Sequence, residues 1–157
     1  NYKLYFGGVL GNYYLILYFP EVFGYELFEM SLTSPDSYST DYEFFSGRKT
    51  YSENCEGGYY TVRLAITEHM KKINKQGTAI AFRFITPQYN APLGVWVTKE
   101  ATRKSLSQRP YEFNSKQELL NQARLITKNE FSFDLDNLLV KSVLLKNLSV
   151  QRKLFEF

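Results

Sequence analysis

The chain has 157 residues, of which 44% are hydrophobic, 17% aromatic and 22% charged, with a formal net charge of +3. This balance fits one globular domain with a real core and argues against a disordered chain, and a single cysteine excludes an intramolecular disulfide framework and an all-cysteine zinc site. The longest apolar stretches are far shorter than the roughly 20 residues that span a bilayer, so we expect a soluble, cytoplasmic protein without membrane contact.

Charge is distributed unevenly along the chain. Residues 1–60 carry a net charge of −5, whereas residues 61–157 carry +8. Such a split favours a basic face that could contact nucleic acid or an acidic protein. A solvated, lysine-rich surface explains the same numbers equally well, because the basic residues are spread out rather than clustered.

The first half of the chain is predicted to be rich in strands. Residues 3–6 and 13–19 carry β-favouring aromatic side chains on either side of a glycine-rich turn region, which predicts a hairpin or two neighbouring strands ending at Pro20. Residues 25–32 alternate only roughly and are interpreted as a further strand. Residues 33–41 are rich in Ser, Thr, Pro and Asp, which predicts a loop.

The hydrophobic period changes after Gly58. Apolar residues recur at helical spacing over residues 59–74, which predicts an amphipathic helix entered from a glycine turn. Residues 78–86 are apolar on both faces except for Arg83, the pattern of a central strand covered on both sides. Residues 93–98 predict another strand, and residues 99–106 predict a short helix.

The remainder of the chain is predicted to be helical. Ser115 and Glu118 have the spacing of a capping box that opens a helix over residues 116–126. Leucines between residues 135 and 148 predict a last helix. This order of elements predicts an α+β fold, with a mixed or antiparallel sheet packed against about four helices in a single domain over residues 1–147.

The last ten residues, 148–157, are interpreted as a tail that binds the replication sliding clamp. Gln151 stands three residues before Leu154, and Phe157 follows three residues later, which is the spacing of a PCNA-interacting peptide. A 3₁₀ turn would bring Leu154 and Phe157 to one side to fill an apolar pocket, with the Gln151 amide and Phe155 beside them. The alternative is that these residues only finish the preceding helix.

A second group of candidate site residues surrounds the glycine turn before the first helix. A cation on an apolar strand needs a partner, so Arg83 is expected to pair with Glu68 or Glu100 or to contact a bound anion. Backbone N–H groups at the helix start could hold a phosphate that arginine side chains contact in a forked manner. The candidates for this anion or nucleotide site are Arg48, Gly57, Gly58, Tyr59, Arg63, Arg83 and Glu100.

No sequence signature assigns a reaction. The chain contains neither the Walker nor the dinucleotide fingerprint, and it shows no nucleophile elbow or metal triad. Acidic neighbours make Cys55 a poor nucleophile. Catalytic residues therefore stay unassigned, and the sequence leaves open whether the protein is an enzyme.

Several of these motifs resemble, in order and spacing, the C-terminal part of the archaeal Nre DNA-repair family. They are residues 42–51, 56–60, 63–65, 83–85, 87–89 and 92–96, together with Glu68, Lys99, Glu100 and Arg103. The resemblance covers roughly residues 12–157. The family usually has an Arg-Glu pair where this chain has Arg83-Phe84, and another where it has Lys99-Glu100.

The resemblance implies a DNA-repair factor tethered to PCNA, since family members also end in a clamp-binding peptide. Members are longer and have an N-terminal region with cysteines that look like a zinc site. The chain, which begins with Asn, is therefore expected to be a separated C-terminal module or a piece of a longer protein. We expect no cofactor or metal in this chain, and zinc only in that N-terminal region.

DNA is a further candidate partner, which would associate the protein with the nucleoid. The alternative function is an enzyme that acts on a nucleotide or nucleic-acid phosphate through the arginine-rich pocket at the Gly57-Gly58 turn.

Overall fold

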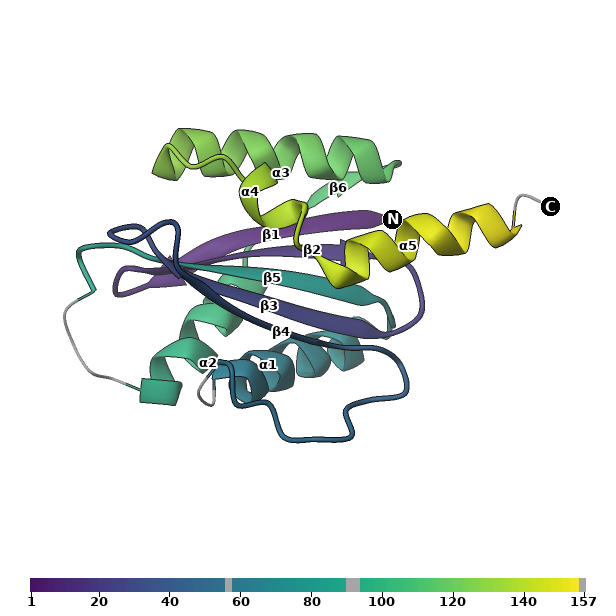
Figure 1. The fold of residues 1–157 in the computed structure, drawn as a ribbon, viewed down its shortest axis with the longest axis horizontal. Coiled ribbons are helices and arrows are strands. Elements are labelled where there is room, and N and C mark those ends of the chain that lie inside the picture. Colours follow the sequence, from purple (N-terminus) through teal and green to yellow (C-terminus); the bar gives the residue numbers. More distant parts are fainter. Residues whose placement is uncertain (56–57, 90–93, 156–157) are drawn as a thin grey trace.

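The structure, a computed structural model, describes residues 1–55, 58–89 and 94–155 and is built on one six-stranded sheet (Figure 1). The strands are β1 (Tyr2–Val9), β2 (Asn12–Phe19), β3 (Gly24–Ser31), β4 (Tyr38–Glu43), β5 (Thr78–Ile85) and β6 (Tyr111–Phe113). The helices are α1 (Gly58–Lys72), α2 (Gly94–Leu106), α3 (Lys116–Phe131), α4 (Asp136–Leu139) and α5 (Val143–Phe155). The strand order is β4-β3-β5-β2-β1-β6, and β3 runs parallel to β5 while the other described neighbours are antiparallel. The predicted α+β fold with a mixed sheet is confirmed.

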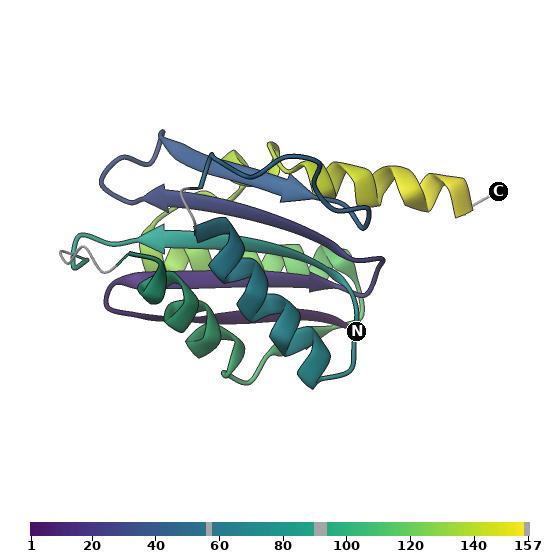
Figure 2. The ribbon, with the colours of Figure 1, turned by 90° about the horizontal axis from the view of Figure 1, so that it is seen from below.

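Helices cover both faces of the sheet (Figures 1 and 2). α1 and α2 lie side by side on one face, where Tyr59 and Val62 pack with Tyr25 and Leu27 of β3. α3, α4 and the start of α5 lie on the other face, over a core that includes Phe82. The sheet is therefore buried on both sides along its central strands.

β5 is the covered central strand that its sequence predicts. It lies between parallel β3 and antiparallel β2. Phe82 and Phe84 belong to the core beneath α3, whereas Ala79 and Ala81 belong to the core beneath α1. Because side chains alternate along a strand, Arg83 shares the α1 face with the two alanines, near the carboxyl end of β5.

The hairpin of β1 and β2 turns at Leu10 and Gly11, both with positive φ (52° and 79°), as a two-residue hairpin turn of type I′ requires. A Cβ on Gly11 would lie 2.8 Å from the backbone nitrogen of Tyr89. Glycine therefore also lets the segment after β5 approach the turn, where the Thr86 N–H donates to the Gly11 carbonyl at 2.9 Å.

The expected strand at residues 93–98 is wrong, because α2 is one helix from Gly94 to Leu106. β-branched Val95 and Val97 suggested a strand, yet Val95 is exposed whereas Val97 and Ala101, four residues apart, are buried. A spacing of four residues is the helical period, so packing against the sheet overrides the local preference for a strand.

The expected loop over residues 33–41 is also partly wrong, because β4 begins at Tyr38. The buried positions of this strand are occupied by Asp41 and Glu43. The sequence therefore lacks the alternation of apolar and polar residues that predicts a strand. Both carboxylates have arginine partners, which compensates for their burial. β4 pairs with β3 and forms one edge of the sheet.

The helices near the C-terminus differ in length from their predictions. Ser115 accepts a hydrogen bond from the Glu118 N–H at 3.2 Å, as the capping box predicts, and α3 continues five residues past Ile126 to Phe131. The leucine-rich segment forms two helices, α4 and α5, instead of one.

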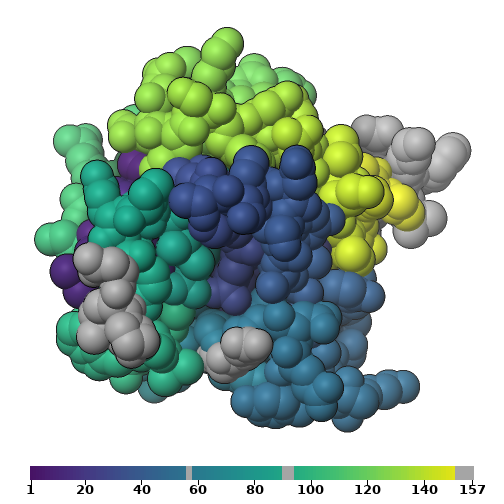
Figure 3. Space-filling model, turned by 60° about the vertical axis from the view of Figure 1, so that its left-hand side comes forward, coloured from purple at the N-terminus to yellow at the C-terminus, as the bar shows by residue number. Residues whose placement is uncertain are grey.

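α5 crosses the domain boundary that the sequence placed after residue 147. Leu144 and Leu148 pack in the core, whereas Val150 is 57% exposed. The helix points away from the sheet in Figure 1 and lies at the margin of the molecule in Figure 3. Phe157 lies outside the described residues, as do the side chains of Gln151, Leu154 and Phe155, so the tail stays a prediction.

Candidate functional site

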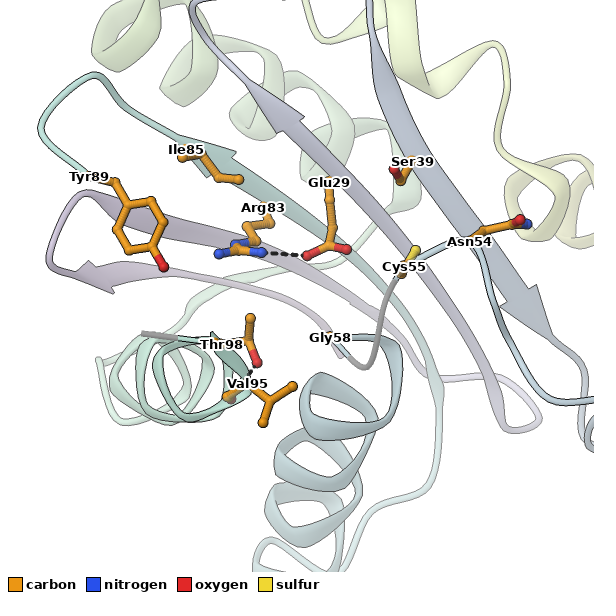
Figure 4. Close-up of a pocket in the computed structure, with 11 residues that line it drawn as sticks. Glu29, Ser39, Asn54, Cys55, Gly58, Arg83, Ile85, Tyr89, Val95 and Thr98 are labelled. Carbon is orange, nitrogen blue, oxygen red and sulfur yellow. Dashed lines mark hydrogen bonds and ion pairs between the residues drawn. The ribbon is translucent and has the colours of Figure 1, made fainter. Parts of the chain in front are cut away.

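A cavity of about 460 Å³ opens between the sheet and the starts of α1 and α2 (Figure 4). It lies near the carboxyl ends of the parallel strands β3 and β5, a common place for ligands in α/β sheets. Its lining residues are Glu29, Ser39, Asn54, Cys55, Gly58, Arg83, Ile85, Tyr89, Gly94, Val95 and Thr98.

An ion pair between neighbouring parallel strands lines the sheet side of this cavity. Glu29 and Arg83 are register partners on β3 and β5, and Arg83 Nη1 donates to Glu29 Oε2 at 2.7 Å. Their side chains are 11% and 12% exposed. Arg83 Nε and Nη2 both donate to Asn12 Oδ1, at 2.8 and 2.5 Å. The carboxylate and the amide together fix the guanidinium in one plane beside the cavity.

The partner of Arg83 is Glu29 rather than Glu68 or Glu100. Those two carboxylates both contact Arg103, at 3.1 and 3.3 Å, on the partly exposed outer surface of α1 and α2. Exposed pairs of this kind contribute little to stability. The acidic partner was missed because it lies on a different strand, and only the register of β3 against β5 places it beside Arg83.

The start of α1 comes close to the Glu29 carboxylate. A Cβ on Gly58 would lie 3.0 Å from Glu29 Oε2, so a larger residue here would require the carboxylate to shift, whereas glycine lets the helix begin close to the ion pair. The Glu29 carboxylate thus lies at the positive end of the α1 dipole. The hydroxyls of Thr61 and Thr98 lie 2.6 Å apart and join α1 to α2 at the same end.

Arg48, Tyr59 and Arg63 belong to a separate polar network, the β4 network, which forms around the carboxylates of Asp41 and Glu43 on β4. Arg48 pairs with Asp41, and Arg63 contacts both carboxylate oxygens of Glu43, with Nη2 to Oε2 at 3.2 Å. The Tyr59 hydroxyl donates to Glu43 at 3.0 Å. Arg48 and Arg63 are thus already engaged with carboxylates, and neither lines the cavity.

The electrostatics of this network favour a charged Asp41. Burial alone would raise the pKa of Asp41, but hydrogen bonds from Ser52, the Tyr42 N–H and Arg48 outweigh it and hold the pKa below its ordinary value. A carboxylate that is hydrogen-bonded in this way stays ionised at neutral pH. The network therefore acts as a stable structural unit that connects β4 to α1.

The predicted anion site is thus divided in the structure. Gly58 and Arg83 line the cavity together, whereas Arg48, Tyr59 and Arg63 lie in the β4 network, and Glu100 pairs with Arg103. Gly57 lies outside the described residues. Anion binding by these residues stays a prediction.

Cys55 faces the cavity as a neutral thiol. Burial, followed by the nearby charges of Glu29 and Asp41, raises the pKa of Cys55 to about 12. A thiol with this pKa is a poor nucleophile at neutral pH. Within the described residues, no group of three His, Cys, Asp or Glu side chains is placed to hold a metal ion. None of the described helices is both long and apolar enough to cross a membrane.

A buried carboxylate on β3 holds the start of α5. Glu26 accepts a hydrogen bond from the Val143 N–H at 2.8 Å and another from the Ser142 hydroxyl. The Ser142 oxygen in turn accepts the Leu145 N–H at 3.0 Å. These bonds satisfy the first turn of α5, so the sheet sets the direction in which residues 148–155 leave the domain.

Comparison with known proteins identifies the family. A family model described as "Archaeal Nre, C-terminal" matches residues 43–157. The chain belongs to the archaeal Nre family. The match starts at the end of β4, so it includes α1, β5 and α2, which supply Gly58, Arg83 and Thr98 to the cavity.

Three Nre proteins are similar to the chain over part of their length. It is 35% identical to DNA repair protein NreA of Archaeoglobus fulgidus over 126 residues, which cover 76% of this chain and 32% of that protein. It is 39% identical to NreB of the same organism over 118 residues, with coverage of 75% and 29%. For NreA of Haloferax volcanii the identity is 28% over 110 residues, with coverage of 64% and 26%. The chain thus matches about a third or less of these relatives, and no solved structure matches it.

Proposed function

We propose that the chain is the C-terminal part of a DNA-repair factor that is tethered to the sliding clamp PCNA through Gln151, Leu154 and Phe157. The observation that carries the proposal is the spacing of these three residues in a chain that belongs to the Nre family. Its full-length relatives are called DNA repair proteins, which supports the repair role.

The anchoring of α5 supports this use of the tail. Glu26 and the core contacts of Leu144 fix the first turns of the helix, while its backbone continues outward to Phe155. Residues three apart lie on the same side of a helical turn, and this is the spacing of Gln151 and Leu154 in the sequence. A partner could reach this segment without disturbing the sheet.

The tether explains how a repair factor would find its substrate. A short peptide segment typically reaches only micromolar affinity, which allows the protein to exchange on the clamp. A clamp that encircles DNA would bring the domain to the nucleoid, where DNA itself is the second proposed partner.

A competition titration tests the tether. A synthetic peptide of residues 148–157 should bind PCNA with micromolar affinity and displace the full chain from the clamp. A peptide with Gln151 and Leu154 exchanged is the matched control, because it has the same composition and charge, and it should not compete. Retention of the full chain at saturating peptide would show that the clamp, if bound at all, is bound elsewhere.

A genetic test addresses the repair role. The full-length protein carrying L154A and F157A should leave cells more sensitive to DNA-damaging agents than the wild-type protein does. The exposed residues Phe45 and Leu125 provide a matched control, since F45A and L125A remove the same side-chain types from other surfaces. Equal survival of cells with the tail variant and with the wild type would show that repair does not depend on the tether.

A further inference from the structure

We infer that the cavity beside the Glu29–Arg83 pair binds a nucleobase, one that presents a hydrogen-bond donor next to an acceptor, as guanine and cytosine do. The inference deepens the proposed repair function and rests on it for the choice of ligand. The volume of about 460 Å³ lies within the range of roughly 300–1,000 Å³ that is typical of small-molecule sites.

The charges of the lining favour an uncharged polar ligand. Its described residues include one carboxylate, Glu29, and one guanidinium, Arg83, which neutralise each other. A phosphate placed here would gain from Arg83 but would be repelled by the adjacent Glu29. The remaining polar groups, on residues such as Ser39, Asn54 and Thr98, are neutral donors and acceptors.

The ion pair retains hydrogen-bonding capacity on both partners. Arginine has five N–H donors, and three of those on Arg83 are used by Glu29 and Asn12 within the described residues. A carboxylate has about four acceptor positions, so Glu29 can accept further bonds beside the one from Arg83. A base edge with a donor for Glu29 and an acceptor for Arg83 would match this arrangement.

An unpaired hydroxyl lies behind the same residues. Tyr14 is the neighbour of Arg83 across β2 and β5 and is fully buried, yet its hydroxyl has no hydrogen-bond partner within the described part of the chain. Its pKa is raised by burial, and it interacts electrostatically with Arg83, Glu29 and Cys55, three residues that line the cavity. Tyr14 is not itself among the residues that line the cavity, so its hydroxyl adds to the buried polar groups behind the ion pair without contacting a ligand there.

The rim offers an aromatic ring. Tyr89 follows β5, and its ring lies beside Arg83 at the edge of the cavity (Figure 4). Aromatic side chains stack on bases of any sequence, while fixed polar groups read the base edge. The nucleobase could belong to a free nucleoside or be extruded from DNA, and both sources present the same edge.

The test is a binding titration with the full chain, followed by NMR. Deoxyguanosine or deoxycytidine should shift the resonances of Arg83 and Gly58, whereas inorganic phosphate alone should not. R83Q and E29Q should each weaken binding at least tenfold. E68Q is the matched control, because Glu68 also pairs with an arginine but lies on the exposed surface of α1.

A second variant guards against loss of folding. Val95 is half exposed and lines the cavity, so V95W should fill the opening and abolish binding without breaking the ion pair. V140W, at another exposed valine outside the cavity lining, should bind as the wild type does. Normal affinity in V95W, or the same shifts with phosphate alone, would overturn the inference.

A separate measurement with a DNA duplex decides whether the base belongs to a free nucleoside or is extruded from DNA. The fluorescence of an unpaired 2-aminopurine in a duplex should change with the wild type but not with V95W if the base is extruded. Nucleoside binding without this change assigns the site to a free nucleoside. Absence of both signals in a protein that still binds PCNA would overturn the cavity inference and leave the tether standing.

Discussion

Glu26 on β3 accepts the backbone N–H of Val143 at 2.8 Å, which links the interior of the sheet to the first residue of α5. Only 1% of the Glu26 residue surface is exposed. The helix that leads into the proposed clamp-binding tail therefore starts from a buried polar contact rather than from a loose linker. Removal of this contact should change both stability and the direction of the tail.

Substitution of Glu26 by Ala should lower the free energy of unfolding by about 1–3 kcal/mol, because the Val143 N–H and the Ser142 hydroxyl lose a buried acceptor. Urea denaturation measures the loss. E21A is the matched control, since Glu21 is only partly buried and, within the described residues, its side chain makes no hydrogen bond to the start of α5. Equal losses in the two variants would show that the cap contributes nothing.

The same carboxyl should give stability a characteristic pH dependence. Burial raises the pKa of Glu26 above 4.5, although bonds from Ser142 and Val143 oppose it. The folded state thus binds the proton more tightly, so the contribution of Glu26 to the free energy of unfolding falls as pH rises from 4.5 through the folded pKa. The difference between the wild type and E26Q should follow this curve, and a pH-independent difference would contradict it.

The pKa of His69 should lie below the ordinary value for histidine. Burial, then the charges of Lys72 and Lys3, lower the pKa of His69, whose Nε2 lies 3.0 Å from the Tyr5 hydroxyl. Since the unfolded state takes up the proton first, stability should fall as pH drops from about 6.5 through the folded pKa. His69 is the single histidine, so one NMR titration measures the value. K72Q should raise the pKa of His69. K75Q should not, because Lys75 is not among the charges that lower this pKa.

Cys55 should resist thiol reagents in the folded protein. Its pKa of about 12 and its 3% exposure leave little accessible thiolate at pH 8. Modification by a disulfide reagent should be at least ~100-fold slower in buffer than in denaturant. Because this is the single cysteine, the absorbance change reports it alone. Rapid modification of the native protein would show that the cavity wall opens readily.

Ser132 holds the end of α3 in a conformation that suits glycine. Its φ is 51°, and its N–H donates to the Lys128 carbonyl at 3.0 Å. S132G should raise the free energy of unfolding by up to about 1 kcal/mol, because glycine adopts positive φ without steric cost. S107G is the control. Ser107 is not among the described residues with positive φ, so glycine at this position should lower the free energy of unfolding instead.

The sequence predicted the elements whose local pattern agrees with their packing. β5 has apolar residues on both faces, and α3 begins at a capping box, so both were found. β4 was missed because its buried positions are Asp41 and Glu43, whose arginine partners come from later segments. The strand expected at residues 93–98 failed because packing on the sheet outweighs the β preference of two valines.

The candidate site shows the same limit. An isolated arginine on an apolar strand correctly indicated that Arg83 needs a partner, and the glycine turn correctly marked the start of α1. The identity of the partner depends on which residue of β3 stands beside Arg83, and a pattern within one strand contains no information about register. Tyr14 could not be singled out either, since an unsatisfied hydroxyl is visible only in three dimensions.

The most direct test of the clamp tether is a calorimetric titration of PCNA with the full chain and with its L154A/F157A variant. Buried anchors of this kind typically contribute about 2 kcal/mol or more each, so the double variant should lose nearly all measurable affinity while it unfolds at the wild-type temperature. The F45A/L125A variant should bind like the wild type. Unchanged affinity in L154A/F157A would contradict the central claim that these residues connect the domain to the clamp.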